Sequence, residues 1–209
     1  MKLFLASAFS QVSKLLLEKV GDLNGKKVIF IENASDGGSG YKWWIKVDRD
    51  AFLELSCEIV EADLRVLSPE GLQEKLEESD IIHFCGGSVL YLMSVIRNGG
   101  FEGVIKKYVS EGKIIYTGSS AGSMVVARDL TLSKYDQEEL EYIDVEKFKN
   151  FSGMNLVNFL ILPHCGNKDF VESNIAMVEK MPDVDQTLLF IYDNQAVFVE
   201  DDSFKIVSI

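Results

Sequence analysis

A serine lies in a short stretch of small residues, Gly118-Ser-Ser-Ala-Gly122, with a glycine two positions away on each side of Ser120. The spacing G-x-S-x-G is typical of an abrupt turn from a strand into a helix, which holds the serine hydroxyl out of the turn. A hydroxyl held in this way is a candidate nucleophile for acyl transfer. Because glycine and serine are common residues, the pattern also arises by chance, and the rest of the chain must supply the partners of such chemistry.

The base is the first partner, because a serine hydroxyl is a weak nucleophile at neutral pH and in most serine hydrolases gives its proton to a histidine. The chain has two histidines. His83 lies within the apolar run Asp80–Cys85, and we interpret it as a core histidine with satisfied ring nitrogens. His164 follows the apolar run Phe159–Leu162 and a proline, so we expect it at a strand end on the same side of the sheet as Ser120. His164 is therefore the predicted base.

The oxyanion that forms during attack on a carbonyl needs two hydrogen-bond donors. The N–H of Ala121 follows the nucleophile at the expected start of a helix, where the helix dipole also favours negative charge. The second donor is predicted in Gly86-Gly87-Ser88, at a strand end that could neighbour the serine strand. The alternative interpretation of this glycine pair is a simple turn between a strand and a helix.

Two residues are candidates for the acid that orients the histidine. Asp136 lies sixteen residues after Ser120 in the acid-rich stretch Ser133–Glu139, which we interpret as solvated surface. Asp193 ends the apolar run Leu188–Tyr192 and precedes another strand pattern, so it lies at a strand-end turn; its alternative role is to form that turn. The residues alone leave both candidates open.

These residues are expected on alternating strands and helices, because short apolar runs alternate with helical patterns. The expected strands are Leu3–Ala6, Lys27–Glu32, Cys57–Ala62, Asp80–Cys85, Lys113–Tyr116 and Phe159–Leu162, and the expected helices are Val12–Val20, Val47–Leu55, Leu72–Glu77, Val89–Arg97, Val104–Glu111 and a segment from about Asp169 to Lys180. Strands or a terminal hairpin are expected over Thr187–Tyr192, Ala196–Val199 and Phe204–Val207. The order predicts an α/β fold with a mostly parallel sheet and helices on both faces, and ligands bind at the carboxyl ends of such strands.

Length and charge narrow the class of protein. At 209 residues we expect a single domain over residues 1–209. A formal charge of −12 repels nucleic acid and anionic membrane surfaces, so neither is an expected partner. The three cysteines follow no disulfide or zinc pattern, which favours a reducing, cytoplasmic setting. The N-terminal apolar run is short for a signal peptide and is interpreted as a first strand, and no apolar stretch is long enough for a membrane span.

Three motifs in this order resemble the dipeptidase E and cyanophycinase family of serine peptidases: a strand followed by Gly86-Gly87-Ser88, the turn Gly118–Gly122, and Leu162-Pro-His164. The resemblance spans most of the chain. It implies a three-layer α/β/α sandwich similar to class I glutamine amidotransferases and hydrolysis of small peptides without a cofactor or a metal. It also implies Ser120 as nucleophile, His164 as base and the amides near Gly87 and Ala121 as the oxyanion hole.

The resemblance also bears on the acid and on substrate binding. A glutamate in a similar turn is the third catalytic member in that family, which favours Asp193, although aspartate is one methylene shorter. Ser88 stands where the family has asparagine, and Ser119 where a bulky aromatic is common, so we expect a wider pocket. The segment after His164 has Lys168 instead of the arginine that binds substrate aspartate in the dipeptidase branch, and a lysine cannot pair with a carboxylate in the bidentate manner of arginine.

Two other functions remain open at this point. An α/β-hydrolase esterase uses the same turn but places its histidine after the last strand, whereas about forty-five residues follow His164. A binding or sensor protein could keep this fold without catalysis. The prediction is a serine peptidase of small peptides, acting as a monomer or a homodimer, with Ser120, His164 and Asp193 as its catalytic residues.

Overall fold

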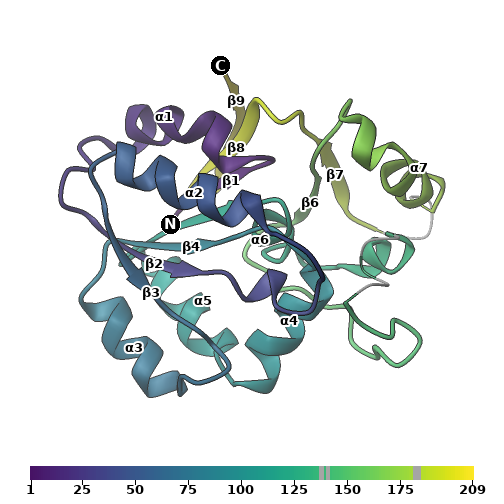
Figure 1. Cartoon of the computed structure of the whole chain (residues 1–209), viewed down its shortest axis with the longest axis horizontal. Coiled ribbons are helices and arrows are strands. Elements are labelled where there is room, and N and C mark those ends of the chain that lie inside the picture. Colours follow the sequence, from purple (N-terminus) through teal and green to yellow (C-terminus); the bar gives the residue numbers. More distant parts are fainter. Residues whose placement is uncertain (137–138, 140–141, 181–184) are drawn as a thin grey trace.

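A seven-stranded sheet forms the centre of the protein in the computed structural model, which describes residues 1–136, 139, 142–180 and 185–209 (Figure 1). The strand order is β3-β2-β4-β5-β1-β8-β9. The strands are β1 (Lys2–Ala6), β2 (Lys27–Ile31), β3 (Glu58–Glu61), β4 (Ile81–Phe84), β5 (Ile115–Ser119), β8 (Gln195–Glu200) and β9 (Ser203–Ser208). The first five strands of this order are parallel, and β8 and β9 are antiparallel additions at one side.

A second, two-stranded parallel sheet is formed by β6 (Phe159–Leu162) and β7 (Thr187–Phe190). The expected strands Phe159–Leu162 and Thr187–Tyr192 therefore both form, but they pair with each other. The expectation that Phe159–Leu162 joins the main parallel sheet is wrong. The remaining two closing segments make the antiparallel hairpin β8–β9.

Helices cover both faces of the main sheet, which confirms the predicted α/β fold with a mostly parallel sheet. Helices α1 and α2 lie on one face, and α3, α4 and α5 lie on the other (Figure 1). The helices are α1 (Phe9–Val20), α2 (Trp43–Glu54), α3 (Pro69–Glu77), α4 (Val89–Asn98), α5 (Glu102–Ser110), α6 (Ala121–Met124) and α7 (Val171–Glu179). Within the described ranges, no helix is both long and apolar enough to span a membrane.

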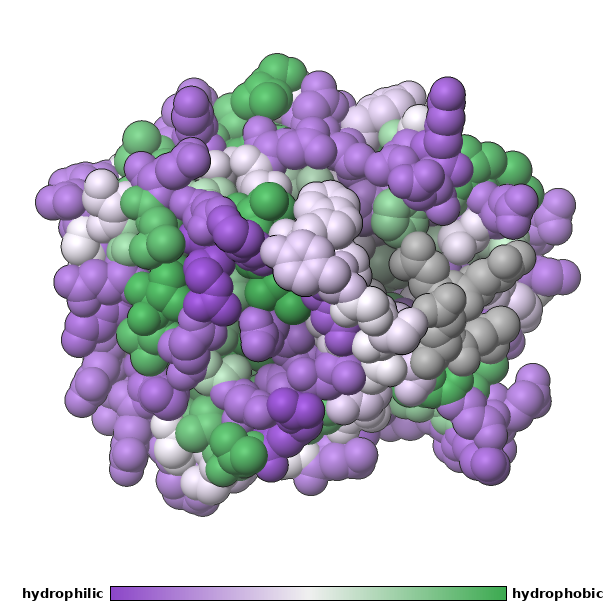
Figure 2. Space-filling model, viewed as in Figure 1, coloured by the Kyte–Doolittle hydropathy of each residue, from purple (hydrophilic) through white to green (hydrophobic). Residues whose placement is uncertain are grey.

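The alternation of side chains along each central strand builds two cores. In β1, Leu3 and Leu5 contribute to the core under α3, α4 and α5, whereas Phe4 and Ala6 contribute to the core under α1 and α2. Both sets are fully buried, as expected for parallel strands that are covered on both faces. The expected first strand is thus a central strand of the sheet. Hydrophilic residues cover most of the face of the molecule that Figure 2 shows.

His83 lies in the interior on β4, among three phenylalanine rings, as its interpretation as a core histidine requires. Its Nδ1 atom lies 2.9 Å from the hydroxyl of Thr117, but its Nε2 atom faces only Asp48 Oδ2 at 3.6 Å and makes no hydrogen bond within the described structure. Cys85 lies close by, and the ligand atoms of these Asp, His and Cys side chains lie within 4.8 Å of one another. The ring is therefore satisfied on one side only.

Candidate active site

Ser120 lies in a sharp turn between β5 and α6, with φ 49° and ψ −112°. The turn depends on small neighbours. A Cβ on Gly118 would lie 2.4 Å from the carbonyl oxygen of Gly122, and a Cβ on Gly122 would lie 2.0 Å from the carbonyl oxygen of Phe84. Both distances are too short for any side chain, so the two glycines of the G-x-S-x-G spacing are required by sterics.

His164 lies between Ser120 and Asp193. Its Nε2 atom is 2.9 Å from the Ser120 hydroxyl oxygen, and its Nδ1 atom is 2.6 Å from Oδ1 of Asp193. A proton on Nδ1 that is donated to the carboxylate leaves the Nε2 lone pair directed at the serine hydroxyl. The hydrogen bond with His164 is the main reason that the pKa of Asp193 is lowered to about 2, so this carboxyl is ionised at neutral pH.

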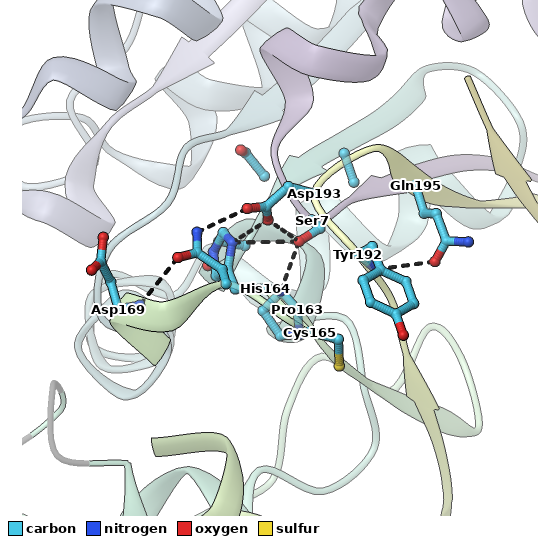
Figure 3. A network of polar contacts seen from close by, with 12 residues as sticks. Ser7, Pro163, His164, Cys165, Asp169, Tyr192, Asp193 and Gln195 are labelled. Atoms are coloured by element: carbon cyan, nitrogen blue, oxygen red, sulfur yellow. Dashed lines mark hydrogen bonds and ion pairs between the residues drawn. The ribbon is translucent and has the colours of Figure 1, made fainter. Parts of the chain in front are cut away.

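Ser7 and Asn167 hold the carboxylate of Asp193 and were not predicted from the sequence. The hydroxyl of Ser7, just after β1, donates to Asp193 Oδ1 at 2.8 Å and accepts the backbone N–H of His164 at 2.8 Å (Figure 3). The amide of Asn167 donates to Asp193 Oδ2 at 2.9 Å. The Phe170 ring stacks on the His164 ring with centroids 4.1 Å apart. The imidazole and its acid are thus held on several sides.

The other candidate acid, Asp136, lies near Glu139 and helps to raise the pKa of that residue. The interpretation of Ser133–Glu139 as solvated surface is wrong for Glu139, which is 3% exposed. Its carboxylate accepts the Val89 N–H at 2.6 Å, the Leu90 N–H and the Ser88 hydroxyl, so it caps the N-terminus of α4. Burial raises its pKa to about 8 against the opposing effect of these donors. Positions 137 and 138 lie outside the described residues.

The two amides predicted as an oxyanion hole both lie between a strand and a helix: Gly87 between β4 and α4, and Ala121 at the start of α6, just after β5. Gly87 has a φ of 141°, and a Cβ on it would lie 2.2 Å from the Ala34 carbonyl oxygen, so only glycine fits. The adjacent Gly86 lies beside Ser120, since a Cβ on it would be 3.4 Å from Cβ of that residue. Within the described part of the chain, the N–H groups of Gly87 and Ala121 donate to no acceptor. Both amides are therefore free to bind a ligand oxygen.

The three predicted substrate-binding side chains differ in exposure. Ser88 is buried, and its hydroxyl accepts the Tyr91 N–H at 2.9 Å and donates to Glu139, so this hydroxyl is already used within the protein. Ser119 is also buried and accepts the Phe9 N–H at 3.1 Å. Lys168 is exposed, in a short 3-10 helix between His164 and α7. Of the three, Lys168 alone presents its polar group to solvent.

Comparison with known proteins gives consistent matches over nearly the whole chain. The model of peptidase family S51 matches residues 3–207. An uncharacterized peptidase of Pasteurella multocida (strain Pm70) is 31% identical over 208 residues, which cover 99% of this chain and 96% of that protein. An uncharacterized peptidase of Listeria innocua is 30% identical over 168 residues, 80% of this chain and 78% of that protein.

Two solved structures share the fold. A crystal structure described as a peptidase E protein from Listeria monocytogenes EGD-e has a TM-score of 0.89 at 24% identity and covers 100% of this chain and 98% of its own. A peptidase from an acI-B1 Actinobacterium has a TM-score of 0.64 at 20% identity, over 100% of this chain and 87% of that one. At these identities the likeness concerns the fold alone.

Proposed function

The chain belongs to peptidase family S51 and is a peptidase, and on this premise we propose that it hydrolyses small peptides through a covalent acyl-enzyme on Ser120. The observation that carries this proposal is the continuous line of contacts from the Ser120 hydroxyl through both ring nitrogens of His164 to the Asp193 carboxylate. A nucleophile, a base and an orienting acid in this geometry are what serine hydrolysis requires.

In the proposed reaction, Nε2 of His164 takes the proton of the Ser120 hydroxyl while Oγ attacks the peptide carbonyl carbon. The carbonyl oxygen becomes an oxyanion, which the N–H groups of Gly87 and Ala121 stabilise. Asp193 stabilises the imidazolium that forms. His164 then gives its proton to the leaving amine as the C–N bond breaks, and a water molecule, activated by the same histidine, hydrolyses the acyl-enzyme. These steps use only side chains and backbone amides of the chain.

The chain order of the proposed residues favours a peptidase of this family over an α/β-hydrolase esterase. The esterase order is serine, acid, histidine. Here the acid that bonds to His164 is Asp193, which follows the histidine in the chain. An esterase would require the acid to come from the segment between Ser120 and His164, which contains Asp136.

The proposed substrates are dipeptides or other short peptides. Exposed Lys168, on the segment after His164, is proposed as a flexible donor for a substrate carboxylate. We therefore propose no selectivity for an N-terminal aspartate.

We further propose one domain over residues 1–209, active as a monomer or a homodimer in the cytoplasm. The three free cysteines support a reducing compartment.

The test combines a reactive probe with a substrate screen. A fluorophosphonate probe should label the wild-type protein and fail to label Ser120→Ala. A dipeptide library with acidic, basic and apolar N-terminal residues should show turnover that Ser120→Ala lowers by about 10⁴-fold or more. The control is Ser123→Ala, whose hydroxyl donates to the Ala6 carbonyl oxygen at 2.7 Å. Activity of Ser120→Ala within tenfold of wild type would exclude the serine mechanism, and a folded wild-type protein that neither reacts with the probe nor cleaves peptides would indicate a binding protein.

A further inference from the structure

The carbonyl oxygen of Gly86, next to the proposed oxyanion hole, accepts hydrogen bonds from two side chains of a distant segment. The Ser35 hydroxyl donates to it at 2.7 Å, and Nε1 of Trp44 donates to it at 3.3 Å. The same indole N–H also lies 3.0 Å from the Ser35 hydroxyl oxygen, so the three groups form a closed triangle. Ser35 is 1% exposed, which shields this arrangement from water.

The direction of the Gly87 N–H follows from the direction of this carbonyl. The Gly86–Gly87 peptide is trans, because the described structure contains no cis peptide bond. In a planar trans peptide, the C=O and the N–H point in opposite directions. A peptide between two glycines rotates more easily than others, since neither residue has a Cβ that restricts it. Hydrogen bonds to the carbonyl therefore oppose a rotation that would turn the N–H away.

We propose that Ser35 and Trp44 are positioning residues, which hold the Gly86 carbonyl and thereby keep the Gly87 N–H directed at the oxyanion. This inference rests on the proposed serine mechanism and on the role of Gly87 within it. Neither side chain donates to the oxyanion itself. Their effect is on the preorganisation of a donor, and such donors contribute because they need no rearrangement as charge develops.

The position of Trp44 is itself fixed from inside the protein. Trp44 is the second residue of α2, and Asp48 lies one turn later on the same helix. The Asp48 carboxylate is buried, accepts the Ser10 N–H at 3.0 Å and faces His83 at 3.6 Å. The hydrogen bond from Ser10 ties α2 to α1, while Oδ2 of Asp48 makes no hydrogen bond within the described structure. The indole is therefore presented to Gly86 by an anchored helix.

Trp44 also lies beside the nucleophile. A Cβ on Gly86 would lie 3.7 Å from Cδ1 of Trp44 and 3.4 Å from Cβ of Ser120, so the indole and the serine flank the same glycine. A substitution of Trp44 must therefore keep an aromatic ring, or it changes the shape of the site as well as the hydrogen bond. Trp44→Phe meets this requirement, because it removes the N–H and retains a ring.

The experiment compares Trp44→Phe, Ser35→Ala and the double variant with wild type and with Ser120→Ala. The matched control is Trp43→Phe, since Trp43 is the neighbouring tryptophan and is 59% exposed. Three quantities are measured: kcat and KM on the best dipeptide of the library, and the second-order rate of labelling by the fluorophosphonate, whose tetrahedral adduct places an oxygen in the same hole. Melting temperatures establish that each variant is folded.

Each single substitution should lower kcat and the labelling rate in parallel by about fivefold or more, with KM changed less than about threefold. The double variant should lose about 100-fold, approaching the cost of deleting one oxyanion donor. Trp43→Phe should stay within twofold of wild type. If Ser35→Ala does not fold, the kcat and labelling rate of Trp44→Phe alone test the inference, and values within twofold of wild type would contradict it.

Two results would overturn the inference while the serine mechanism stands. One is a kcat of the double variant within twofold of wild type when Ser120→Ala is inactive. The other is an effect confined to KM, which would make Trp44 a substrate contact. An active Ser120→Ala would instead refute the proposed function, and the inference with it.

Discussion

Nδ1 of His164 lies 2.6 Å from Oδ1 of Asp193, and the two residues follow the ends of two strands, β6 and β7, that pair in parallel. Parallel strands bring their carboxyl ends to the same edge of a sheet, so residues just beyond them meet. The aspartate therefore reaches the imidazole directly, without the extra methylene of a glutamate.

Replacing Asp193 should impair catalysis and leave the fold intact. Asp193→Asn removes the charge that stabilises the imidazolium and favours the wrong tautomer, so we expect kcat to fall by at least about 100-fold with little change in melting temperature. Asp136→Asn is the control and should change kcat less than about fivefold. Steady-state kinetics on the best dipeptide measure both, and a larger loss in Asp136→Asn would transfer the role of the acid to that residue.

The buried Glu139 should make stability depend on pH. Its pKa is about 8 in the folded protein, mainly because of burial, and about 4.3 in an unfolded chain. Between these values the folded state retains a proton that the unfolded state has released, so stability falls as pH rises through this window. The glutamine side chain of Glu139→Gln is neutral at every pH. The melting temperature of this variant should therefore fall less between pH 5 and pH 8.5 than that of the wild-type protein. The exposed control Glu74→Gln should keep the wild-type profile. An unchanged decline in Glu139→Gln would show that another group causes it.

The second glycine of the serine turn should tolerate no side chain. Gly122→Ala places a Cβ 2.0 Å from the Phe84 carbonyl oxygen, which belongs to the backbone of β4 and cannot move without disturbing the sheet. We expect a destabilisation of about 2 kcal/mol or more, seen as a melting temperature lower by at least about 5 °C. The matched control is Gly103→Ala in α5, where a Cβ meets no atom within 4 Å and alanine favours the helix. Equal melting temperatures of the two variants would contradict the steric argument.

The cysteines should not take part in hydrolysis. Burial raises the pKa of the Cys57 thiol to about 11, and it also raises the pKa of Cys85 and of Cys165, which neighbours the proposed base. Few thiolates are therefore present at neutral pH, and the thiolate is the form that reacts with alkylating agents. Iodoacetamide at pH 7 should leave peptidase activity unchanged while the fluorophosphonate abolishes it. Rapid inactivation by iodoacetamide would point to a cysteine in the site.

The sequence predicts those parts of the site that depend on local pattern. The glycines around Ser120 and the proline before His164 mark strand ends. The strand–helix alternation also predicts both ends on one side of the same sheet, whereas the structure has His164 after β6 in the second, two-stranded sheet. Ser7 also follows a strand, but its contact with His164 joins residues 157 positions apart and depends on β1 lying next to both β5 and β8. That neighbourhood is a property of the strand order, which no local pattern encodes.

Other features depend on long-range packing in the same way. The acidic stretch Ser133–Glu139 indicates polar surface when the sequence is considered alone. Only the folded chain shows that the carboxyl group of Glu139 is buried at the start of α4. Trp44 lies in an aromatic pair that has no catalytic pattern, and its proposed role depends on its contact with Gly86, which only the folded chain shows. The departure of β7 from the main sheet likewise follows from its pairing with β6.

The proposed catalytic residues are divided between two sheets. Ser120 directly follows β5 of the seven-stranded sheet and His164 follows β6 of the two-stranded sheet, whereas Asp193 lies in the connection from β7 to β8 and is attached to both sheets. A shift of one sheet against the other would therefore separate the proposed nucleophile from the proposed base and abolish activity. Ser7 crosses this boundary, because it follows β1 of the large sheet and bonds to both His164 and Asp193. The Ser7 hydroxyl thus ties His164 and Asp193 to β1, the strand that pairs with β5, and helps to hold the two sheets in register at the proposed active site.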